Sequence, residues 1–144
     1  FIELALSLEL PIIIHSRESD KRMHEILKSH FDGSKLYGVW HCFSGDKKLA
    51  FKVIDNGFVL GFCGNITYKN SSDTVSVIKN IPLEFMLLET DSPYLTPQKH
   101  RGKLNEPSFV CEIYNFVCES RGMSLEILKQ NLYNNFVSLF KISE

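Results

Sequence analysis

Short apolar runs alternate with amphipathic stretches along the chain. The runs cover residues 10–15, 38–43, 58–62 and 85–89 and are rich in branched and aromatic side chains. Apolar residues follow one another in these runs instead of alternating with polar ones, which is typical of strands covered on both faces in a parallel sheet. The pattern therefore predicts four buried parallel strands.

The stretches between the runs have the spacing of amphipathic helices. After the first run, Met23, Ile26, Leu27 and Phe31 share one helix face, and Ser19 is a candidate N-cap. Four further helices are predicted on the same grounds: from Ser44 or Asp46 to Asn56-Gly57, from Ser71-Ser72 over Ile78, from Pro107 to Arg121-Gly122, and from Ser124 to near Phe140. An apolar-periodic segment also precedes the first run. Because the sequence starts inside that segment, at Phe1, we expect an upstream part of the protein to be missing.

Strand and helix alternate four times, which indicates an α/β fold. Two architectures fit this alternation: half of a (β/α)8 barrel and a small doubly wound sheet. No glycine-rich phosphate loop with G-x-G-x-x-G spacing follows any of the strands. We expect residues 1–144 to form a single domain.

Composition narrows the function classes. The formal net charge is −1, from 16 Lys and Arg against 17 Asp and Glu, so the chain lacks a global positive field that would hold nucleic acid. A phosphate-rich partner would need a local feature, such as a metal ion or one or two arginines. No apolar run approaches the roughly 20 residues that span a bilayer. The four cysteines lack C-x-x-C spacing, so we expect buried thiols, with Cys111 and Cys118 on one helix face, in a reducing, cytoplasmic setting.

The ends of the predicted strands carry the residues best suited to chemistry. The first strand ends in His15, the second carries His41 near its end, and Asp91 follows the fourth. Because the carboxyl ends of parallel strands meet at one rim, we expect these side chains to converge. Two imidazoles and a carboxylate are suitable ligands for a divalent ion such as Zn, Mn, Fe or Ni, and the carboxylate also accepts Mg.

Each of these residues also has a purely structural explanation. A histidine at a strand end often packs or forms a hydrogen bond, and a carboxylate before Ser92-Pro93 can cap a turn. Arg17 can form a surface ion pair with Glu18 or Asp20. The segment Asn105-Glu106-Pro107 can be a plain helix start or part of the site. The remaining histidines lack the strand-end context and are expected to face solvent: His24, His30 and His100.

Several segments match one known family. They are LPIIIHSRES (10–19), GVWHCFSG (38–45), GFVLGFCGNITYKN (57–70), IPLEFMLLETDSPYLTP (81–97) and RGKLNEP (101–107), with NNFVSLF (134–140) at the end. With these segments the chain resembles the TatD family of metal-dependent deoxyribonucleases, which are amidohydrolase-like TIM barrels. HCFSG and LLETDSPYL together are specific, and the match runs through the whole chain in one register.

The resemblance implies a fold and a set of metal ligands. The expected fold is the C-terminal half of a (β/α)8 barrel, with about four parallel strands paired in chain order and helices around them. The implied metal ligands are His15, His41 and Asp91, for two divalent ions (Mg, Mn or Zn) in the intact family. The family's N-terminal H-x-H motif and its bridging Glu are not in this sequence.

The resemblance also implies an activity, hydrolysis of DNA phosphodiester bonds by a metal-activated water. Asp91 would then act as a catalytic residue as well as a ligand, and Arg17 would contact a substrate phosphate. Tyr94 and Phe62 are candidate stacking surfaces for a base, and for Phe62 packing in the core is the favoured alternative. Two alternatives remain open: an amidohydrolase-type amide or ester hydrolase, and a catalytically incomplete fragment.

A half-barrel leaves two sheet edges and an apolar inner face without neighbours. Side chains alternate along a strand, so Ile12 or Ile13, and Leu87 or Leu88, must point inward. We therefore expect the chain to pair with the missing N-terminal half of the barrel, or to self-associate through its open edges.

Overall fold

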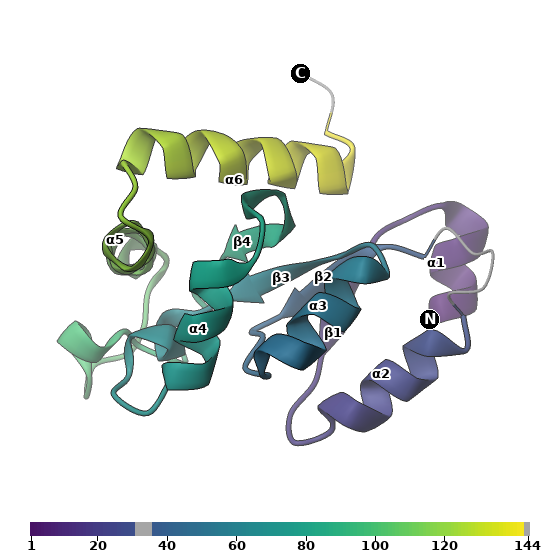
Figure 1. Cartoon of the computed structure of the whole chain (residues 1–144), viewed down its shortest axis with the longest axis horizontal. Coiled ribbons are helices and arrows are strands. Elements are labelled where there is room, and N and C mark those ends of the chain that lie inside the picture. Colours follow the sequence, from purple (N-terminus) through teal and green to yellow (C-terminus); the bar gives the residue numbers. More distant parts are fainter. Residues whose placement is uncertain (31–35, 143–144) are drawn as a thin grey trace.

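The computed structural model describes residues 1–30 and 36–142, and the expected helix residue Phe31 lies outside them (Figure 1). Within this part of the chain, four strands form one sheet: β1 (Ile12–His15), β2 (Gly38–His41), β3 (Phe58–Phe62) and β4 (Met86–Leu88). The α-helices are α1 (Ile2–Leu8), α2 (Asp20–Lys28), α3 (Lys47–Asp55), α4 (Ser72–Asn80), α5 (Val110–Arg121) and α6 (Leu125–Phe140). Short 3₁₀ helices lie at η1 (Gly64–Thr67), η2 (Leu83–Phe85), η3 (Gln98–His100) and η4 (Pro107–Phe109).

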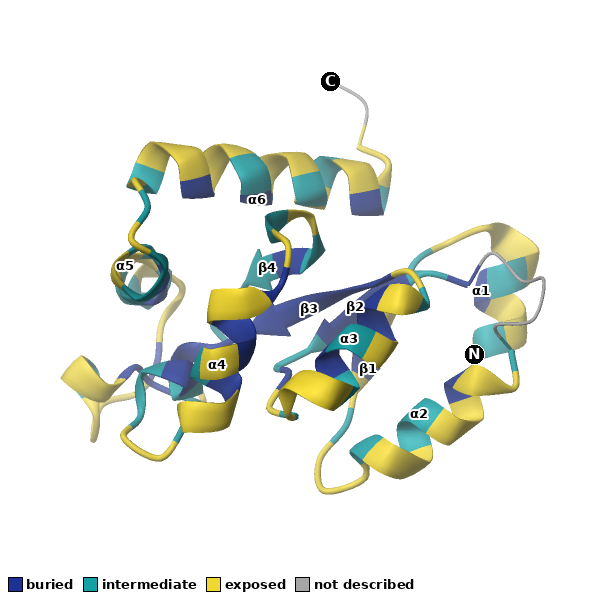
Figure 2. Cartoon of the chain, viewed as in Figure 1, coloured by how far each residue is buried: buried dark blue, intermediate teal, exposed yellow. Residues whose placement is uncertain are grey.

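The sheet is parallel and its strands lie in chain order, β1-β2-β3-β4, as predicted. The register pairs His15 with His41, Val39 with Val59, and Gly61 with Leu87. Every residue of β3 is buried, so this strand runs through the middle of the molecule (Figure 2). The doubly wound alternative, which would reverse the strand order, is excluded.

Even-numbered strand residues face the helices. Ile14, Trp40, Leu60, Phe62 and Met86 all belong to one buried cluster. Helices α3, α4, α5 and α6 add to this cluster Ala50, Val53, Val77, Ile78, Ile113, Val117 and Leu128. Phe62 is fully buried there, so the favoured expectation of core packing is confirmed and stacking on a base is excluded. Its even position in β3 places its ring on the helix-covered face.

Odd-numbered strand residues line the opposite face, and α6 covers part of it. Val39 and Val59 are buried together with Leu139 near the end of α6, and Leu87 and Phe140 pack against them. Ile13, by contrast, is 65% exposed. The inner face is thus closed near the amino ends of β2 and β3 and open at β1.

Side-chain caps define several helix ends. The Asp46 carboxylate accepts a hydrogen bond from the Leu49 amide (2.8 Å) at the start of α3, and Ser124 caps α6 in the same way. Gly122 ends α5 in the left-handed conformation, with φ of 63°. Ser19 precedes α2, but its hydroxyl contacts Ser16 instead of a helix amide.

The cysteines are free thiols, and only Cys63 is buried. Cys111 is exposed on α5, so the expectation that both helix cysteines are buried is wrong for this residue. Among residues 1–30 and 36–142, the helices are too short or too polar to cross a bilayer.

Truncating Leu139 tests the contact between α6 and the inner face. Leu139→Ala removes the side chain that covers Val39 and Val59, so we expect a loss of about 2–5 kcal/mol in the free energy of unfolding. Ile127→Ala on the same helix is the control, because Ile127 is exposed, and it should change stability by about 0.5 kcal/mol. Urea unfolding of the 144-residue chain measures both. Equal losses in the two variants would show that α6 does not cover the sheet as described.

Candidate metal centre

The polar end of the inner face lies at the carboxyl ends of the strands. His15 and His41 are register partners at the ends of β1 and β2, and their ring centroids are 5.9 Å apart. Glu89 follows β4, and its amide donates to the carbonyl of Phe62 (3.0 Å), so the pairing with β3 continues one residue beyond the strand. The odd-numbered positions therefore bring two imidazoles and a carboxylate onto one face at one rim.

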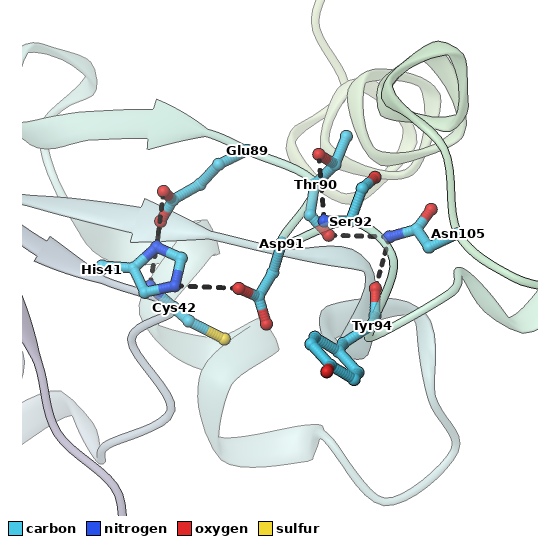
Figure 3. Close-up of polar contacts among 8 residues, drawn as sticks. All are labelled: His41, Cys42, Glu89, Thr90, Asp91, Ser92, Tyr94 and Asn105. Carbon is cyan, nitrogen blue, oxygen red and sulfur yellow. Dashed lines mark hydrogen bonds and ion pairs between the residues drawn. The ribbon is translucent and has the colours of Figure 1, made fainter.

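His41 lies between two carboxylates (Figure 3). Its Nδ1 is 2.7 Å from Oε2 of Glu89, and its Nε2 is 3.2 Å from Oδ1 of Asp91. The other oxygen of Glu89, Oε1, accepts a hydrogen bond from the amide of Cys42 (2.9 Å). The side chains of His41, Glu89 and Asp91 are 17%, 28% and 32% exposed, so all three are partly screened from water.

The two carboxylates change the acidity of the imidazole. Burial lowers the pKa of His41, but the hydrogen bond to Glu89 and the negative charges of Glu89 and Asp91 raise it more. The net effect is a pKa above the ordinary value of 6.5. The carboxylates therefore favour the protonated form of the His41 ring.

The loop that carries Asp91 is held in a fixed shape. Asp91 has a left-handed backbone, with φ of 56°, and its carbonyl accepts a hydrogen bond from the Tyr94 amide (2.8 Å). Buried Asn105 donates through Nδ2 to the carbonyls of Thr90 (2.7 Å) and Tyr94 (2.5 Å). Cys42, directly after β2, is also left-handed, with φ of 51°. Such conformations are unfavourable for residues with a Cβ and persist where surrounding contacts hold them.

Thiols lie beside the same groups. The interaction with the neighbouring Cys63 thiol lowers the pKa of Cys42. The interaction with Cys42, together with burial, raises the pKa of Cys63. One ligand atom each of His41, Cys63 and Glu89 lie within 4.8 Å of one another. The rim thus offers nitrogen, oxygen and sulfur donors in a small volume.

The structure brings His15, His41 and Asp91 to one rim, as their strand-end positions predicted. Arg17 is exposed in the loop after β1, and within the described part of the chain it forms no ion pair with Glu18 or Asp20. Asn105 stabilises the Asp91 loop through its hydrogen bonds, in addition to preceding the helical segment at Pro107.

The three other histidines, His24, His30 and His100, are half-buried, so the expectation that they face solvent is wrong. His100 is half-buried and stacks on Phe109, with ring centroids 4.0 Å apart. His24 is also half-buried, and its Nδ1 is fully buried without a hydrogen-bond partner in the structure. The expectation of solvent-facing side chains overlooked the packing of the helix and loop that carry them.

Glu89 is the site residue that sequence reasoning did not single out. It occupies the next inward-facing position after Leu87, and its carboxylate extends back along the sheet to Gly61 of β3, the register partner of Leu87. A Cβ at Gly61 would overlap the Glu89 carboxylate, so the glycine provides the space in which the glutamate reaches His41. The signal in the sequence was this pair, a glycine in a buried strand beside a glutamate that extends the next strand.

The donor set fits a divalent cation. Neutral histidine binds a metal through one nitrogen while the other donates to a carboxylate or carbonyl, which fixes the tautomer and the ring orientation. Glu89 is such a partner for Nδ1, and Nε2 then points toward Asp91. His41, Asp91 and the neighbouring His15 are therefore the residues that would hold the ion.

Replacing Glu89 tests whether this carboxylate is the main group that raises the pKa of His41. In the metal-free chain, Glu89→Gln removes both the charge and the charge-assisted hydrogen bond at Nδ1, so the pKa of His41 should fall. Asp91→Asn should lower this pKa less, because the charge of Asp91 raises the pKa of His41 less than Glu89 does. NMR titration of the His41 ring measures both. Equal shifts, or a larger one for Asp91→Asn, would contradict the assignment of Glu89 as the main partner.

The raised pKa of His41 also makes the free energy of unfolding depend on pH. His41 gains its partner Glu89 only on folding. The contribution of this pair to the free energy of unfolding is therefore fully present below the unfolded pKa of about 6.5. It is lost as the pH rises through the higher folded pKa. The difference in unfolding free energy between the wild type and Glu89→Gln should therefore be larger in mildly acidic buffer than in alkaline buffer.

Comparisons with known proteins agree with this arrangement. The sequence profile of the family described as "TatD related DNase" matches residues 1–141. The uncharacterized metal-dependent hydrolase YcfH of Escherichia coli K12 is 36% identical over 141 residues, which are 98% of this chain and 53% of YcfH. The uncharacterized metal-dependent hydrolase YabD of Bacillus subtilis is 37% identical over 99% of this chain and 55% of its own length.

A solved structure shows the same fold. The crystal structure of YjjV, a TatD homologue from Escherichia coli K12, superposes with a TM-score of 0.90 at 33% identity, covering 99% of this chain and 54% of YjjV. The chain thus spans about half the length of the relatives it matches. The fold expected from the sequence, the C-terminal half of a TIM barrel, is confirmed. The match along nearly the whole sequence and the shared fold establish that the chain belongs to the TatD family of metal-dependent hydrolases.

Proposed function

We propose that this chain supplies part of a metal centre that hydrolyses phosphodiester bonds of DNA, with His15, His41 and Asp91 as metal ligands. The substrate class follows the description of the matching family, TatD related DNase. The relatives themselves are named only as metal-dependent hydrolases. The proposal therefore depends on what the rim of this chain can do with a phosphodiester.

The position of His41 between Glu89 and Asp91 is the observation that carries the proposal. A hydrogen bond from Nδ1 to Glu89 leaves the lone pair on Nε2, which faces Asp91. A divalent ion bound there supplies Lewis acidity toward a phosphoryl oxygen. Glu89 keeps the imidazole in the tautomer and orientation that ligation requires, without itself having to touch the ion.

Asp91 has a second role in this proposal. Its carboxylate lies at the rim and is partly open to water. The side chain of Asn105 holds the loop through hydrogen bonds to its backbone carbonyls. We assign to Asp91 the positioning of the attacking water and the acceptance of its proton. The left-handed backbone at Asp91 keeps its carboxylate directed at His41.

Local positive charge supports a phosphate-rich substrate despite the net charge of −1. Exposed Arg17 follows the strand that ends in His15, and we assign it a contact with a substrate phosphate. A second group, Arg101 and Lys103, lies in the loop after β4, whereas the neighbouring Lys99 is paired with Glu112 (2.8 Å). Arg101 stacks over the ring of Tyr68, with its guanidinium carbon 4.4 Å from the ring centroid. Tyr94 is 70% exposed beside Asp91 and can stack on a base.

Completion of the barrel is part of the proposal. The outer edges of β1 and β4 have no neighbouring strand in the described residues. Apolar side chains border the β1 edge, where residues of α1, β1 and α2 line a groove. We propose that an N-terminal half-barrel covers these edges, or that the chain self-associates through them.

A chimera with the N-terminal half of YcfH tests the activity. This chain replaces the matching C-terminal part of YcfH, and metal-dependent cleavage of an oligonucleotide is measured. Glu89→Gln should lower the rate roughly 10- to 100-fold, because it removes the group that orients a ligand. Asp91→Asn should lower it further, since it removes both a ligand and the proton acceptor. Glu84→Gln, at an exposed glutamate in η2, is the matched control and should leave the rate unchanged.

Two outcomes would contradict the proposal. Hydrolysis of amide or simple ester substrates without cleavage of the oligonucleotide would favour the amidohydrolase alternative. Metal-dependent cleavage by the isolated 144-residue chain, abolished by Asp91→Ala, would show that the centre needs no second half. We expect the isolated chain to bind metal weakly and to cleave DNA at no useful rate.

A further inference from the structure

The loop after β4 presents an arginine that the proposed metal centre does not use. The guanidinium carbon of Arg101 lies 4.4 Å from the centroid of the Tyr68 ring. Tyr68 directly follows η1, the 3₁₀ helix after β3. Because β3 and β4 are parallel neighbours, the loops that follow them both lie at the rim that carries the metal ligands. A cation from one rim loop therefore stacks on an aromatic ring from the other.

Exposure and charge make Arg101 available to a ligand. The residue is exposed, and across residues 1–30 and 36–142 it forms no ion pair with a carboxylate. Stacking covers one face of the guanidinium and leaves its N–H groups, which lie in the guanidinium plane, free to donate hydrogen bonds. A planar fork of donors matches the oxygens of a phosphate group.

Contacts with η1 hold the loop beside the ring. The Gln98 amide donates a hydrogen bond to Oγ1 of Thr67 (2.7 Å). The Tyr68 hydroxyl donates to the carbonyl of Thr96 (2.9 Å). The ring that supports the guanidinium is therefore bonded to the same loop that carries the arginine.

Contacts with the segment around α5 hold the loop from another direction. Nζ of Lys99 lies 2.8 Å from Oε1 of Glu112 in α5. The His100 ring stacks on Phe109 in η4, with centroids 4.0 Å apart. Both residues directly before Arg101 are thus fixed by side-chain contacts, so binding of a ligand by this arginine costs less conformational entropy than binding by a free surface arginine.

The path of the loop separates Arg101 from Asp91. Asn105 bonds to the carbonyls of Thr90 and Tyr94, on either side of Asp91, so the chain leaves the metal ligands and returns to them. Arg101 lies between these points, at the end of η3, where the loop contacts η1. A strand whose scissile phosphate is bound at the metal would therefore meet Arg101 with a different phosphate.

We propose that Arg101, supported by Tyr68, binds a phosphate of the DNA strand other than the one that is cleaved. This inference rests on the proposed function and adds to it a preference for substrates with more than one phosphate. Arg101 is the binding residue, and Tyr68 is a positioning residue that acts through it. In TIM barrels the loops after the last two strands frequently form a phosphate site, and β3 and β4 are the last two strands of this half-barrel.

Binding of a fluorescent single-stranded oligonucleotide to the 144-residue chain, in buffer free of divalent metal, tests the contact without any cleavage. Arg101→Ala should weaken binding roughly 10-fold. It should also reduce the slope of log affinity against log salt by about 0.7, the value for one phosphate contact on a single strand. Lys79→Ala is the matched control, because it removes the same charge from the exposed last turn of α4, and it should change neither quantity. Equal losses in the two variants, or no binding by the wild type, would overturn the proposal.

A double-mutant cycle tests the role of the ring. Tyr68→Leu keeps apolar bulk but removes the stacking face, so it should weaken binding in the wild-type background and have no effect in Arg101→Ala. The same loss in both backgrounds would contradict a role of Tyr68 through Arg101. Arg101→Lys retains the charge without the planar fork, and its affinity should lie between those of the wild type and Arg101→Ala.

The substrate preference is measured in the chimera with YcfH. Arg101→Ala should raise KM for the oligonucleotide. It should also lower the ratio of kcat/KM on the oligonucleotide to kcat/KM on bis(p-nitrophenyl) phosphate, a diester with one phosphate, by roughly 10-fold. An unchanged ratio would show a merely structural role and overturn the preference. A chimera that cleaves neither substrate would count against the proposed function, whereas the binding measurement would still decide whether Arg101 contacts a phosphate.

Discussion

The two-residue repeat of the β-strand is the constraint on which the rest of this molecule depends. In all four strands the even positions face the helices and build the core, and the odd positions face the opposite side. The register pairs His15 with His41 and extends the same face to Glu89. A slip of one residue in β2 would bury His41 against the helices and turn Trp40 toward the rim. Burial of the Trp40 side chain therefore also fixes the position of the chemistry.

The charges and backbone conformations at the rim are energetically unfavourable, and contacts from the core and loops stabilise them. Two carboxylates lie on either side of one imidazole, and the left-handed residues Cys42 and Asp91 lie at the strand ends. These features are unfavourable on their own, because like charges repel and a Cβ opposes that backbone conformation. The buried amide of Asn105 and the fully buried strand β3 hold the arrangement in place. Stability in one part of the fold thus maintains an unfavourable arrangement in another.

Periodicity in the sequence predicted the four parallel strands and their order, because buried parallel strands leave a direct signature of continuous apolar runs. It also predicted that His15, His41 and Asp91 converge, since strand ends in such folds meet at one rim. It did not identify Glu89, because its role requires knowing that the Glu89 carboxylate lies over Gly61 of the neighbouring strand. Nor did it show that Leu139 covers the inner face, since that contact joins positions far apart and depends on the path of α6.

The space shared by Gly61 and Glu89 links the evolution of two positions that belong to different strands. Any side chain at Gly61 occupies the volume of the glutamate carboxylate, so the substitutions tolerated at one position depend on the residue at the other. A larger residue at 61 becomes acceptable only together with a shorter acid at 89, or with the loss of the acid and of its hold on His41. The two positions are therefore epistatic, and in an alignment of functional homologues they should vary as a pair.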